Sequence, residues 1–323
     1  MKLRTSILAG LSILVGGMVS FPAPGDAQQL PPPGQLEQYL PLLAPPPTPE
    51  QAAQADQRQG AHADINGARI FYQVAGQGTP LLLIHGFPLS GQLYQGQLAG
   101  LSKYFTVITP DLRGFGKSLA PDGNGSIQTY AQDMLALLDH LGVQNAVIGG
   151  HSMGGQITLE MYKEQPARFA GMLLIDTDPM AASFVEKGQW QGYREQGAKA
   201  GVSSIVPIIE PQLLTGVTRA LDSAKSATMA NILAEASVNG VLGGGQALAT
   251  RPDYAGLLGA IAVPTLVVIG LEDPVYAFPI SQMTKAAIPN AQLAVILGAS
   301  HASIFERPGL ANQAILDWAS VPR

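Results

Sequence analysis

The residues Gly150-His151-Ser152-Met153-Gly154 carry the strongest chemical signal in this chain. An apolar run, Ala146–Ile148, stands just before them, and a helical pattern begins directly after them. Glycines two residues to either side of a serine let a strand and a helix approach closely, so that the serine projects from a strained turn. Developing negative charge is favoured at the N-terminus of the helix that follows. The spacing therefore predicts Ser152 as a nucleophile for acyl transfer.

A serine hydroxyl is a poor nucleophile at neutral pH and needs a base. The chain has five histidines, and His301 follows an apolar run, Leu293–Leu297, and a short loop. A loop that leaves the carboxyl end of a strand can reach the serine. The other histidines lie near the N-terminal segment, at a helix end or inside glycine-rich turns: His62, His140, His85 and His151. We therefore predict His301 as the base.

The base needs a carboxylate that orients it. Asp273 lies in the loop after the apolar run Thr265–Ile269, at the same expected edge of the sheet as the histidine loop. We predict Asp273 as this acid. Glu272 is its direct neighbour, and Asp176 and Asp178 follow the preceding predicted strand. These three carboxylates remain alternatives.

Acyl transfer also requires hydrogen-bond donors for the oxyanion. The main-chain N–H of Met153, just after the nucleophile, is one expected donor. The other should come from the loop His85-Gly86-Phe87-Pro88, which follows the apolar run Leu81–Ile84. We predict the N–H of Phe87, because Gly86 gives this backbone room to approach.

Short apolar runs without alternation are typical of strands that are covered on both faces. Segments with helical spacing lie between these runs, and such strand–helix alternation predicts a mostly parallel, doubly covered α/β sheet. The predicted strands are Ala68–Val74, Leu81–Ile84, Phe105–Thr109, Ala146–Ile148, Met172–Ile175, Thr265–Ile269 and Leu293–Leu297. The predicted helical faces are Ile127 to Leu141, Ile157 to Phe169, and Ile304 to Trp318 in one or two helices.

The strand–helix alternation stops over residues 178–253, where helical patterns such as Leu221–Val238 predominate. A segment of this length inside a compact domain needs structure of its own, so we expect a helical cap. Ile205–Ile209 and Leu213-Leu214 could line an acyl pocket or form the core of the cap itself. Gly240, Gly243, Gly244 and Gly245 could provide the flexibility of a lid, or they could form a loop between helices.

The four motifs together resemble the α/β-hydrolase superfamily, from Ala61 to about Val321. His85-Gly86-Phe87-Pro88 is similar to its oxyanion motif, and Asp111–Ser118 is similar to its D-x-R-G-x-G-x-S turn. Gly298–Pro308 is similar to its G-x-x-H-x-x-x-x-E-x-P ending. The chain order serine, aspartate, histidine is that of the α/β hydrolases.

Within the superfamily, Phe87–Gly91 is most similar to the cofactor-free haloperoxidase and esterase group. The resemblance implies a Ser-Asp-His hydrolase with a helical cap. Ser152 stands where haloalkane dehalogenases and epoxide hydrolases carry Asp, which argues against both activities. His151-Ser152-Met153 also differs from the Ser-Trp elbow of proline iminopeptidases.

The N-terminal residues 1–27 resemble a secretory signal peptide, with Lys2 and Arg4 before an apolar run and small residues before Ala27. Export to the periplasm or outside the cell is the expectation, and an uncleaved anchor is the alternative. Residues 28–60 are rich in Pro, Gln and Ala and predict a disordered linker. The hydrolase core is then expected over 61–177 and 254–323.

The composition excludes several classes of function. The chain has no cysteine, so it contains neither a disulfide nor a thiolate site. No Lys/Arg cluster suggests a nucleic-acid partner, and the net charge is −5. No cluster of His and carboxylates has metal-ligand spacing, so we expect neither a metal nor a cofactor.

The leading hypothesis is an exported serine hydrolase that cleaves a small, largely apolar carboxylic ester or lactone, without a membrane association once the signal is removed. Carbon–carbon bond hydrolysis and perhydrolysis are alternatives on the same triad. A non-catalytic ligand-binding protein on the same fold is the alternative from another class. The sequence leaves the natural substrate and the oligomeric state open.

Overall fold

The computed structural model describes residues 59–321. The predicted signal peptide (1–27) and all of the predicted linker (28–60) except its last two residues lie outside this described range. Within the range, no helix combines the length and the apolar composition that crossing a membrane would require.

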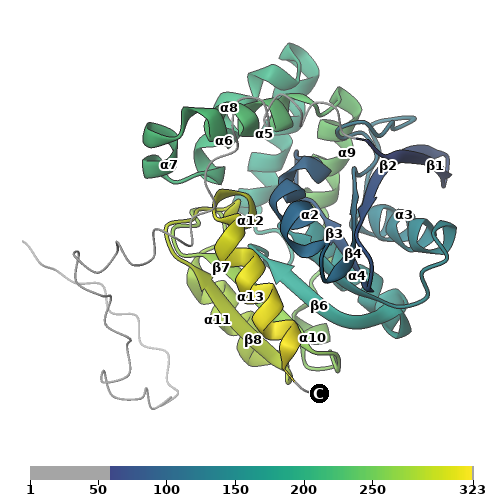
Figure 1. Ribbon diagram of the computed structural model, residues 1–323. Helices are drawn as coiled ribbons and strands as arrows, with labels where there is room; N and C mark the ends of the chain where they lie inside the picture. The colour runs from purple at the N-terminus through teal and green to yellow at the C-terminus, as the bar shows by residue number, and fades with distance from the viewer. Residues whose placement is uncertain (1–58, 322–323) are drawn as a thin grey trace, which may run out of the picture. The chain divides into compact units, whose positions relative to one another are not determined.

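An eight-stranded sheet with the order β1-β2-β4-β3-β5-β6-β7-β8 forms the centre of the described chain (Figure 1). The β1–β2 and β2–β4 pairs are antiparallel, and every other pair is parallel. The strands are β1 (Ala61–Ile65), β2 (Ala68–Ala75), β3 (Thr79–Ile84), β4 (Phe105–Pro110), β5 (Ala146–His151), β6 (Phe169–Ile175), β7 (Thr265–Gly270) and β8 (Ala291–Ile296). All seven predicted strands are present, and the predicted mostly parallel sheet is confirmed.

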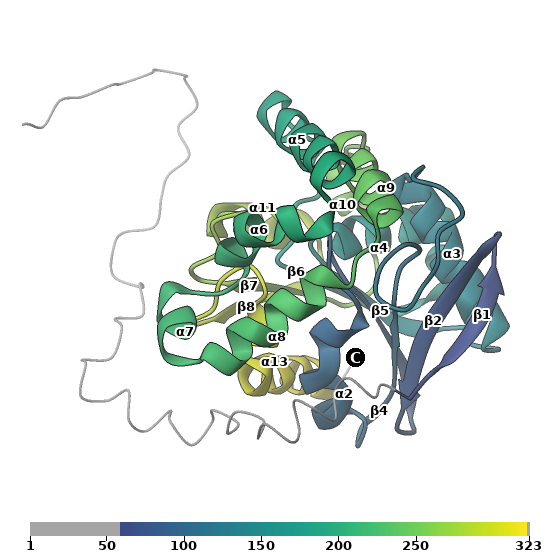
Figure 2. The ribbon, with the colours of Figure 1, turned by 90° about the horizontal axis from the view of Figure 1, so that it is seen from above.

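Helices cover both faces of the sheet, which explains why its central strands are apolar along their length. Figure 2 shows α2 and α13 on one side of the sheet and α3, α4 and α11 on the other. The core helices are α2 (Gln95–Leu101), α3 (Ile127–His140), α4 (Met153–Glu164), α10 (Ala255–Leu258), α11 (Phe278–Ala287), α12 (Ser303–Glu306) and α13 (Pro308–Ser320). Short 3₁₀ turns cover Gly91–Tyr94, Pro166–Arg168 and Val202–Ser204.

Two details of the sequence prediction are wrong. Phe169 does not continue the helix of Ile157 and Met161 but begins β6, because α4 ends at Glu164 and Pro166 cannot donate a helical hydrogen bond. The predicted helix Leu221–Val238 is divided, since its first residue ends α7, its last begins α9 and only Ser223–Ala234 form α8.

The hairpin β1–β2 contains a strand that the sequence analysis missed. Asn66 and Gly67 form its turn, with positive φ angles of 47° and 76°. An Asn-Gly pair between extended segments is a strong hairpin signal, because both residues tolerate this conformation. The apolar runs alone could not reveal β1, since only two of its five residues are buried.

The segment between β6 and β7 is helical, and Figure 1 shows its helices α5 to α8 gathered above the sheet. We refer to residues 178–253 as the cap. Its helices are α5 (Phe184–Ala200), α6 (Val206–Leu213), α7 (Gly216–Leu221), α8 (Ser223–Ala234) and α9 (Val238–Ala249).

The glycine cluster of the cap is not a loop between helices, so that sequence hypothesis is wrong. Gly240, Gly243, Gly244 and Gly245 lie inside helix α9. A Cβ atom on Gly240 would lie 2.2 Å from the carbonyl oxygen of Gly114, and a Cβ atom on Gly244 would lie 2.7 Å from the Phe87 ring. The absence of side chains therefore lets α9 pack closely against the core.

Substitution of Gly240 tests this close packing. We expect Gly240→Ala to lower the free energy of unfolding by about 1–3 kcal/mol, the usual cost of an extra methyl group in a tightly packed place. Gly192→Ala in α5 is the matched control, because nothing lies within 4 Å of its Cβ position. Alanine in an open helical position should raise stability by roughly 0.5–1 kcal/mol. Denaturant unfolding measures both changes, and a gain of stability in Gly240→Ala would contradict the packing argument.

Candidate active site

Ser152 occupies the turn between β5 and α4, as the sequence predicts. Its φ of +53° and ψ of −118° are unusual for a residue with a side chain. Such backbone strain costs about 1–3 kcal/mol and persists only where the surrounding structure imposes it. The residue is only 7% exposed, so the hydroxyl lies below the protein surface.

The glycines on either side of Ser152 allow this turn to form. A Cβ atom on Gly150 would lie 2.0 Å from the carbonyl carbon of Gly154. A Cβ atom on Gly154 would lie 2.1 Å from the carbonyl oxygen of Ile84 in β3. The backbones of β5, α4 and β3 are thus in direct contact, which no larger residue would permit.

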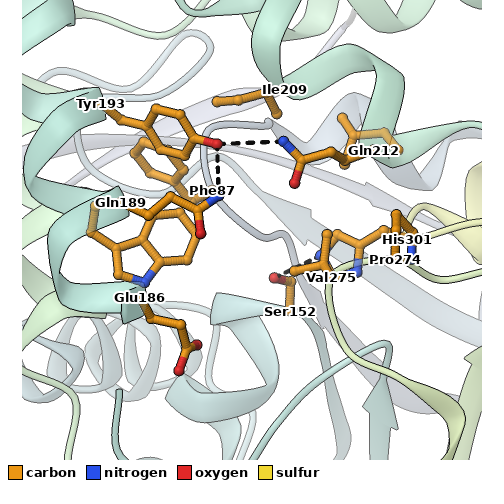
Figure 3. Close-up of a pocket in the computed structure, with 12 residues that line it drawn as sticks. Phe87, Ser152, Glu186, Gln189, Tyr193, Ile209, Gln212, Pro274, Val275 and His301 are labelled. Carbon is orange, nitrogen blue, oxygen red and sulfur yellow. Dashed lines mark hydrogen bonds between the residues drawn. The ribbon is translucent and has the colours of Figure 1, made fainter. Parts of the chain in front are cut away.

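The structure brings Ser152, His301 and Asp273 together (Figure 3 shows the first two). His301 Nε2 lies 3.0 Å from Ser152 Oγ, and His301 Nδ1 lies 2.8 Å from Asp273 Oδ2. The other oxygen of Asp273, Oδ1, accepts the main-chain N–H groups of Val275 and Tyr276 at 2.7 and 3.0 Å. This arrangement has the geometry of a nucleophile, a base and an orienting acid.

The carboxylate of Asp273 determines the state of the imidazole. Because it only accepts hydrogen bonds, Nδ1 of His301 carries the proton, and Nε2 is left to accept the proton of Ser152. Burial by itself lowers the pKa of His301, but the charge of Asp273 and the hydrogen bond to it outweigh burial. The pKa of His301 is therefore raised above its usual value of 6.5.

The residues that carry the two predicted oxyanion donors lie near Ser152, since Met153 follows it in the chain and Phe87 lines the same pocket. Met153 is the first residue of α4, where a main-chain N–H has no acceptor within the helix. Phe87 follows Gly86, whose Cβ position would lie 2.9 Å from the Cβ of Ser152. A bulkier residue than glycine at position 86 would thus push the Phe87 backbone away from Ser152.

Glu272 and Asp178 do not contact His301, although the sequence left both open as the acid. The side chain of Glu272 is exposed. Asp178 accepts the N–H of Met180 and lies 3.8 Å from the guanidinium of Arg251. Neither carboxylate can orient the imidazole.

Asp176, the remaining alternative, is buried beneath the site without contacting the imidazole of His301 directly. It accepts the N–H of Gly270 and both the N–H and Oγ of Ser303, so it joins the loops that carry Asp273 and His301. Burial, and then the charge of Asp273, raise the pKa of Asp176 to about 8. The buried Asp176 carboxyl therefore keeps its proton to a higher pH than an exposed carboxyl does.

Two further histidines hold the main chain around the site, a role that the sequence analysis missed. His85 Nε2 accepts the N–H of Leu112, and its Nδ1 donates to the carbonyl of Gly86 in the oxyanion loop. His151 Nε2 donates to the carbonyl of His301 at 2.6 Å. Burial, and then the neighbouring His301, lower the pKa of His151, which therefore stays neutral.

A pocket of about 140 Å³ opens above Ser152 and His301. One group of lining side chains is apolar or aromatic: Phe87, Trp190, Ile209, Leu213, Pro274 and Val275. The other group is polar and comes entirely from the cap: Glu186, Gln189, Tyr193 and Gln212. Figure 3 shows the amides of Gln189 and Gln212 meeting at the hydroxyl of Tyr193, to which they donate at 2.9 and 3.4 Å.

The expected acyl-pocket residues fall into two groups. Ile209 and Leu213 line the pocket. Ile205 and Leu214 are buried in the hydrophobic core instead. Ile208 is 41% exposed and does not line the pocket, so its expected role in acyl contact is wrong. In helix α6, Ile209 therefore faces the pocket, while the preceding residue, Ile208, faces solvent.

The described residues contain no group of three His, Cys, Asp or Glu side chains that could hold a metal ion.

Comparison with known proteins places this site in a family. A model of the alpha/beta hydrolase fold matches residues 79–308. The chain belongs to the alpha/beta hydrolase family. The matched range includes Phe87, Ser152, Asp273 and His301, and the predicted fold and superfamily resemblance are confirmed.

Known members of the alpha/beta hydrolase family are similar over most of the chain. A 3-oxoadipate enol-lactonase of Acinetobacter baylyi is 30% identical over 76% of this chain and 90% of its own length. A putative non-heme chloroperoxidase of Synechocystis sp. is 29% identical over 77% of this chain and 94% of its own. A thermophilic esterase from Thermogutta terrifontis matches in structure with a TM-score of 0.78, at 30% identity, over 81% of this chain and 98% of its own. The protein is thus a hydrolase enzyme.

The two buried aspartates give a direct test of the carboxylate assignment. We expect Asp273→Asn to slow the labelling of Ser152 by a fluorophosphonate by about 10²–10⁴-fold, because an amide favours the wrong imidazole tautomer. Asp176→Asn should slow labelling less than Asp273→Asn does, because Asp176 does not contact the imidazole and acts only on the loops that carry Asp273 and His301. Labelling kinetics and melting temperatures of both variants are compared with the unsubstituted protein. The reverse order of effects would make Asp176 the acid.

The raised pKa of His301 predicts the pH dependence of labelling. A protonated imidazole cannot accept the serine proton, so the labelling rate should rise as His301 loses its proton. Because Asp273 stabilises the protonated form, the midpoint should lie above the usual histidine value of 6.5. Melting temperatures over the same range show whether the low-pH loss is due to unfolding. A midpoint at or below 6.5 would contradict the electrostatic argument.

Proposed function

We propose that this enzyme hydrolyses carboxylic esters or lactones through an acyl-enzyme intermediate on Ser152. The single observation that carries the proposal is the hydrogen-bonded chain from Ser152 Oγ through His301 to Asp273, at the base of a pocket with two main-chain donors. No other reacting group is needed for acyl transfer to water.

In the first half-reaction, Ser152 Oγ attacks the ester carbonyl while His301 Nε2 takes the serine proton. The charge on the carbonyl oxygen is stabilised by the N–H groups of Phe87 and Met153. Collapse of the tetrahedral intermediate breaks the carbon–oxygen bond to the alcohol, which leaves with the proton from His301. The acyl group remains bonded to Ser152.

In the second half-reaction, a water molecule gives a proton to His301 Nε2 and attacks the acyl carbon. The second tetrahedral intermediate expels Ser152 Oγ, which recovers its proton from the imidazole. The products are the free acid and the original enzyme. In a lactone the alcohol and the acid are one molecule, so a single hydroxy acid leaves.

The two sides of the pocket define the proposed substrate more closely. Phe87, Ile209 and Leu213 suit a short apolar chain, which fits the expectation of a small, largely apolar ester. The polar side, with Gln189 and Gln212 at the Tyr193 hydroxyl, suits one polar group away from the scissile bond. A small neutral ester or lactone with a single remote polar group satisfies both sides.

A second candidate reaction uses hydrogen peroxide in place of water in the second half-reaction. The peroxide attacks the acyl-enzyme and leaves as a peracid, and Ser152 recovers its proton as before. The similarity to a putative non-heme chloroperoxidase supports this candidate. Peroxide and water would compete for the same intermediate.

A substrate panel on the unsubstituted protein and Ser152→Ala tests the proposed function. We expect the variant to lose roughly 10⁴-fold or more of its ester or lactone turnover, since triad members act as a unit. Its melting temperature should stay close to that of the unsubstituted protein, because the side chain is small. The panel includes p-nitrophenyl esters from acetate to octanoate, 6-hydroxyhexanoate beside hexanoate, and simple lactones, each with and without peroxide. Turnover near the normal level in Ser152→Ala would overturn the proposal.

A further inference from the structure

Glu306, which belongs to the last motif of the sequence analysis, has no place in the reaction described above. It ends helix α12 and is completely buried. One carboxylate oxygen accepts the N–H and the hydroxyl of Thr215 at 2.9 and 2.7 Å. The other accepts the N–H of Ser300, the residue just before His301, at 2.7 Å. A single carboxylate thus joins the cap to the histidine loop.

Two more hydrogen bonds connect the same two segments. The N–H of Ala302, just after His301, donates to the carbonyl of Leu213 at 2.9 Å. The hydroxyl of Ser300 donates to the carbonyl of Gln212 at 2.9 Å. Both neighbours of His301 are therefore bonded to the cap segment 212–215.

The main chain of His301 itself is held from the core side. Its carbonyl accepts the His151 Nε2–H at 2.6 Å. The histidine loop is thus fixed by the core on one side and by the cap on the other. Without the cap contacts, the loop that carries the base would be held from the core side alone.

The first two residues of the cap segment 212–215 also face the pocket. The side chains of Gln212 and Leu213 line the pocket, and their carbonyls bond to the residues beside His301. The side chains that line the pocket and the carbonyls that bond to the histidine loop thus belong to the same two residues.

We propose that Glu306 is a positioning residue for His301, and that through it the cap segment 212–215 forms part of the catalytic apparatus rather than a separate lid. The proposal rests on the proposed function, in which His301 moves the proton of Ser152. It assigns a role in the rate of proton transfer to a residue that touches neither the substrate nor the reacting atoms.

Glutamine cannot replace Glu306, although it has nearly the same shape. The carboxylate receives hydrogen bonds from three donors, two on one oxygen and one on the other. In either orientation, an amide would turn its own N–H groups toward a main-chain N–H that is buried. A buried donor without an acceptor is costly, so the Ser300 or the Thr215 contact must open.

The test compares Glu306→Gln with Glu160→Gln as a matched control. Glu160 lies in helix α4, is also buried and does not line the pocket. It accepts a hydrogen bond of 2.8 Å from the hydroxyl of Tyr254. We expect kcat and the fluorophosphonate labelling rate of Glu306→Gln to fall together by about ten- to a hundredfold, because a small displacement of a base costs this much. KM should change by less than about threefold. Glu160→Gln should lose melting temperature but keep kcat and labelling rate.

Thr215→Val provides a second variant if Glu306→Gln does not fold. It removes the hydroxyl that donates to Glu306 and that also caps α7 by accepting the N–H of Thr218 at 3.1 Å. The lost bond to Glu306 should lower kcat and labelling by about two- to tenfold, and the lost cap should lower the melting temperature as well. Unchanged kcat and labelling in folded Glu306→Gln overturns the proposal. If that variant does not fold, unchanged rates in Thr215→Val overturn it.

The proposal and the proposed function fail in different ways. If the unsubstituted protein turns over no ester or lactone and Ser152 is not labelled, the proposed function itself is wrong. If Glu306→Gln raises KM but leaves kcat and the labelling rate of Ser152 unchanged, then the cap segment contributes to substrate binding alone. The positioning role is then wrong.

Discussion

The hydrogen bond between Ser152 Oγ and His301 Nε2 is the contact on which the rest of this site depends. It joins residues that are 149 positions apart in the chain, at a distance of 3.0 Å. The parallel sheet makes this possible, because β5, β7 and β8 end at the same edge and deliver Ser152, Asp273 and His301 there. The strained backbone of Ser152 then raises the hydroxyl toward the imidazole. This strain persists because the main chains of β3, β5 and α4 are in direct contact around the turn, through Gly150 and Gly154.

Two buried carboxyl groups, those of Asp273 and Asp176, lie near His301 at this edge of the sheet. Two charges so close together in a dry environment repel each other, and burial raises the cost. The structure resolves this through unequal surroundings. Both carboxyl groups accept two main-chain N–H groups, but Asp273 also accepts the imidazole N–H, whereas Asp176 accepts only the Ser303 hydroxyl in addition. Asp176 is completely buried, and its pKa rises to about 8. One aspartate orients the base, and the other ties together the loops that carry the acid and the base.

The cap is joined to the core at two separate places. Helix α9 packs on the core through glycines, with Gly240 against Gly114. The segment 212–215 bonds to both neighbours of His301. These contacts make the cap a wall of the active site that also supports the base. The same cap segment thus lines the pocket and bonds to the loop that carries His301.

The sequence by itself determined the nucleophile turn, the sheet and the chain order of Ser152, Asp273 and His301. Each of these follows from a local pattern, because a glycine spacing or an apolar run favours the same local structure whatever its tertiary contacts are. Tertiary structure alone decided which of several carboxylates contacts the imidazole, because Asp273, Asp176 and Asp178 all follow strands that end at the same edge. It also decided that Ile209 faces the pocket while Ile208 faces solvent, and that a run of glycines forms a packed helix face. These outcomes depend on which surfaces meet across the fold, and the distance between two side chains far apart in the chain is not encoded in the neighbours of either one.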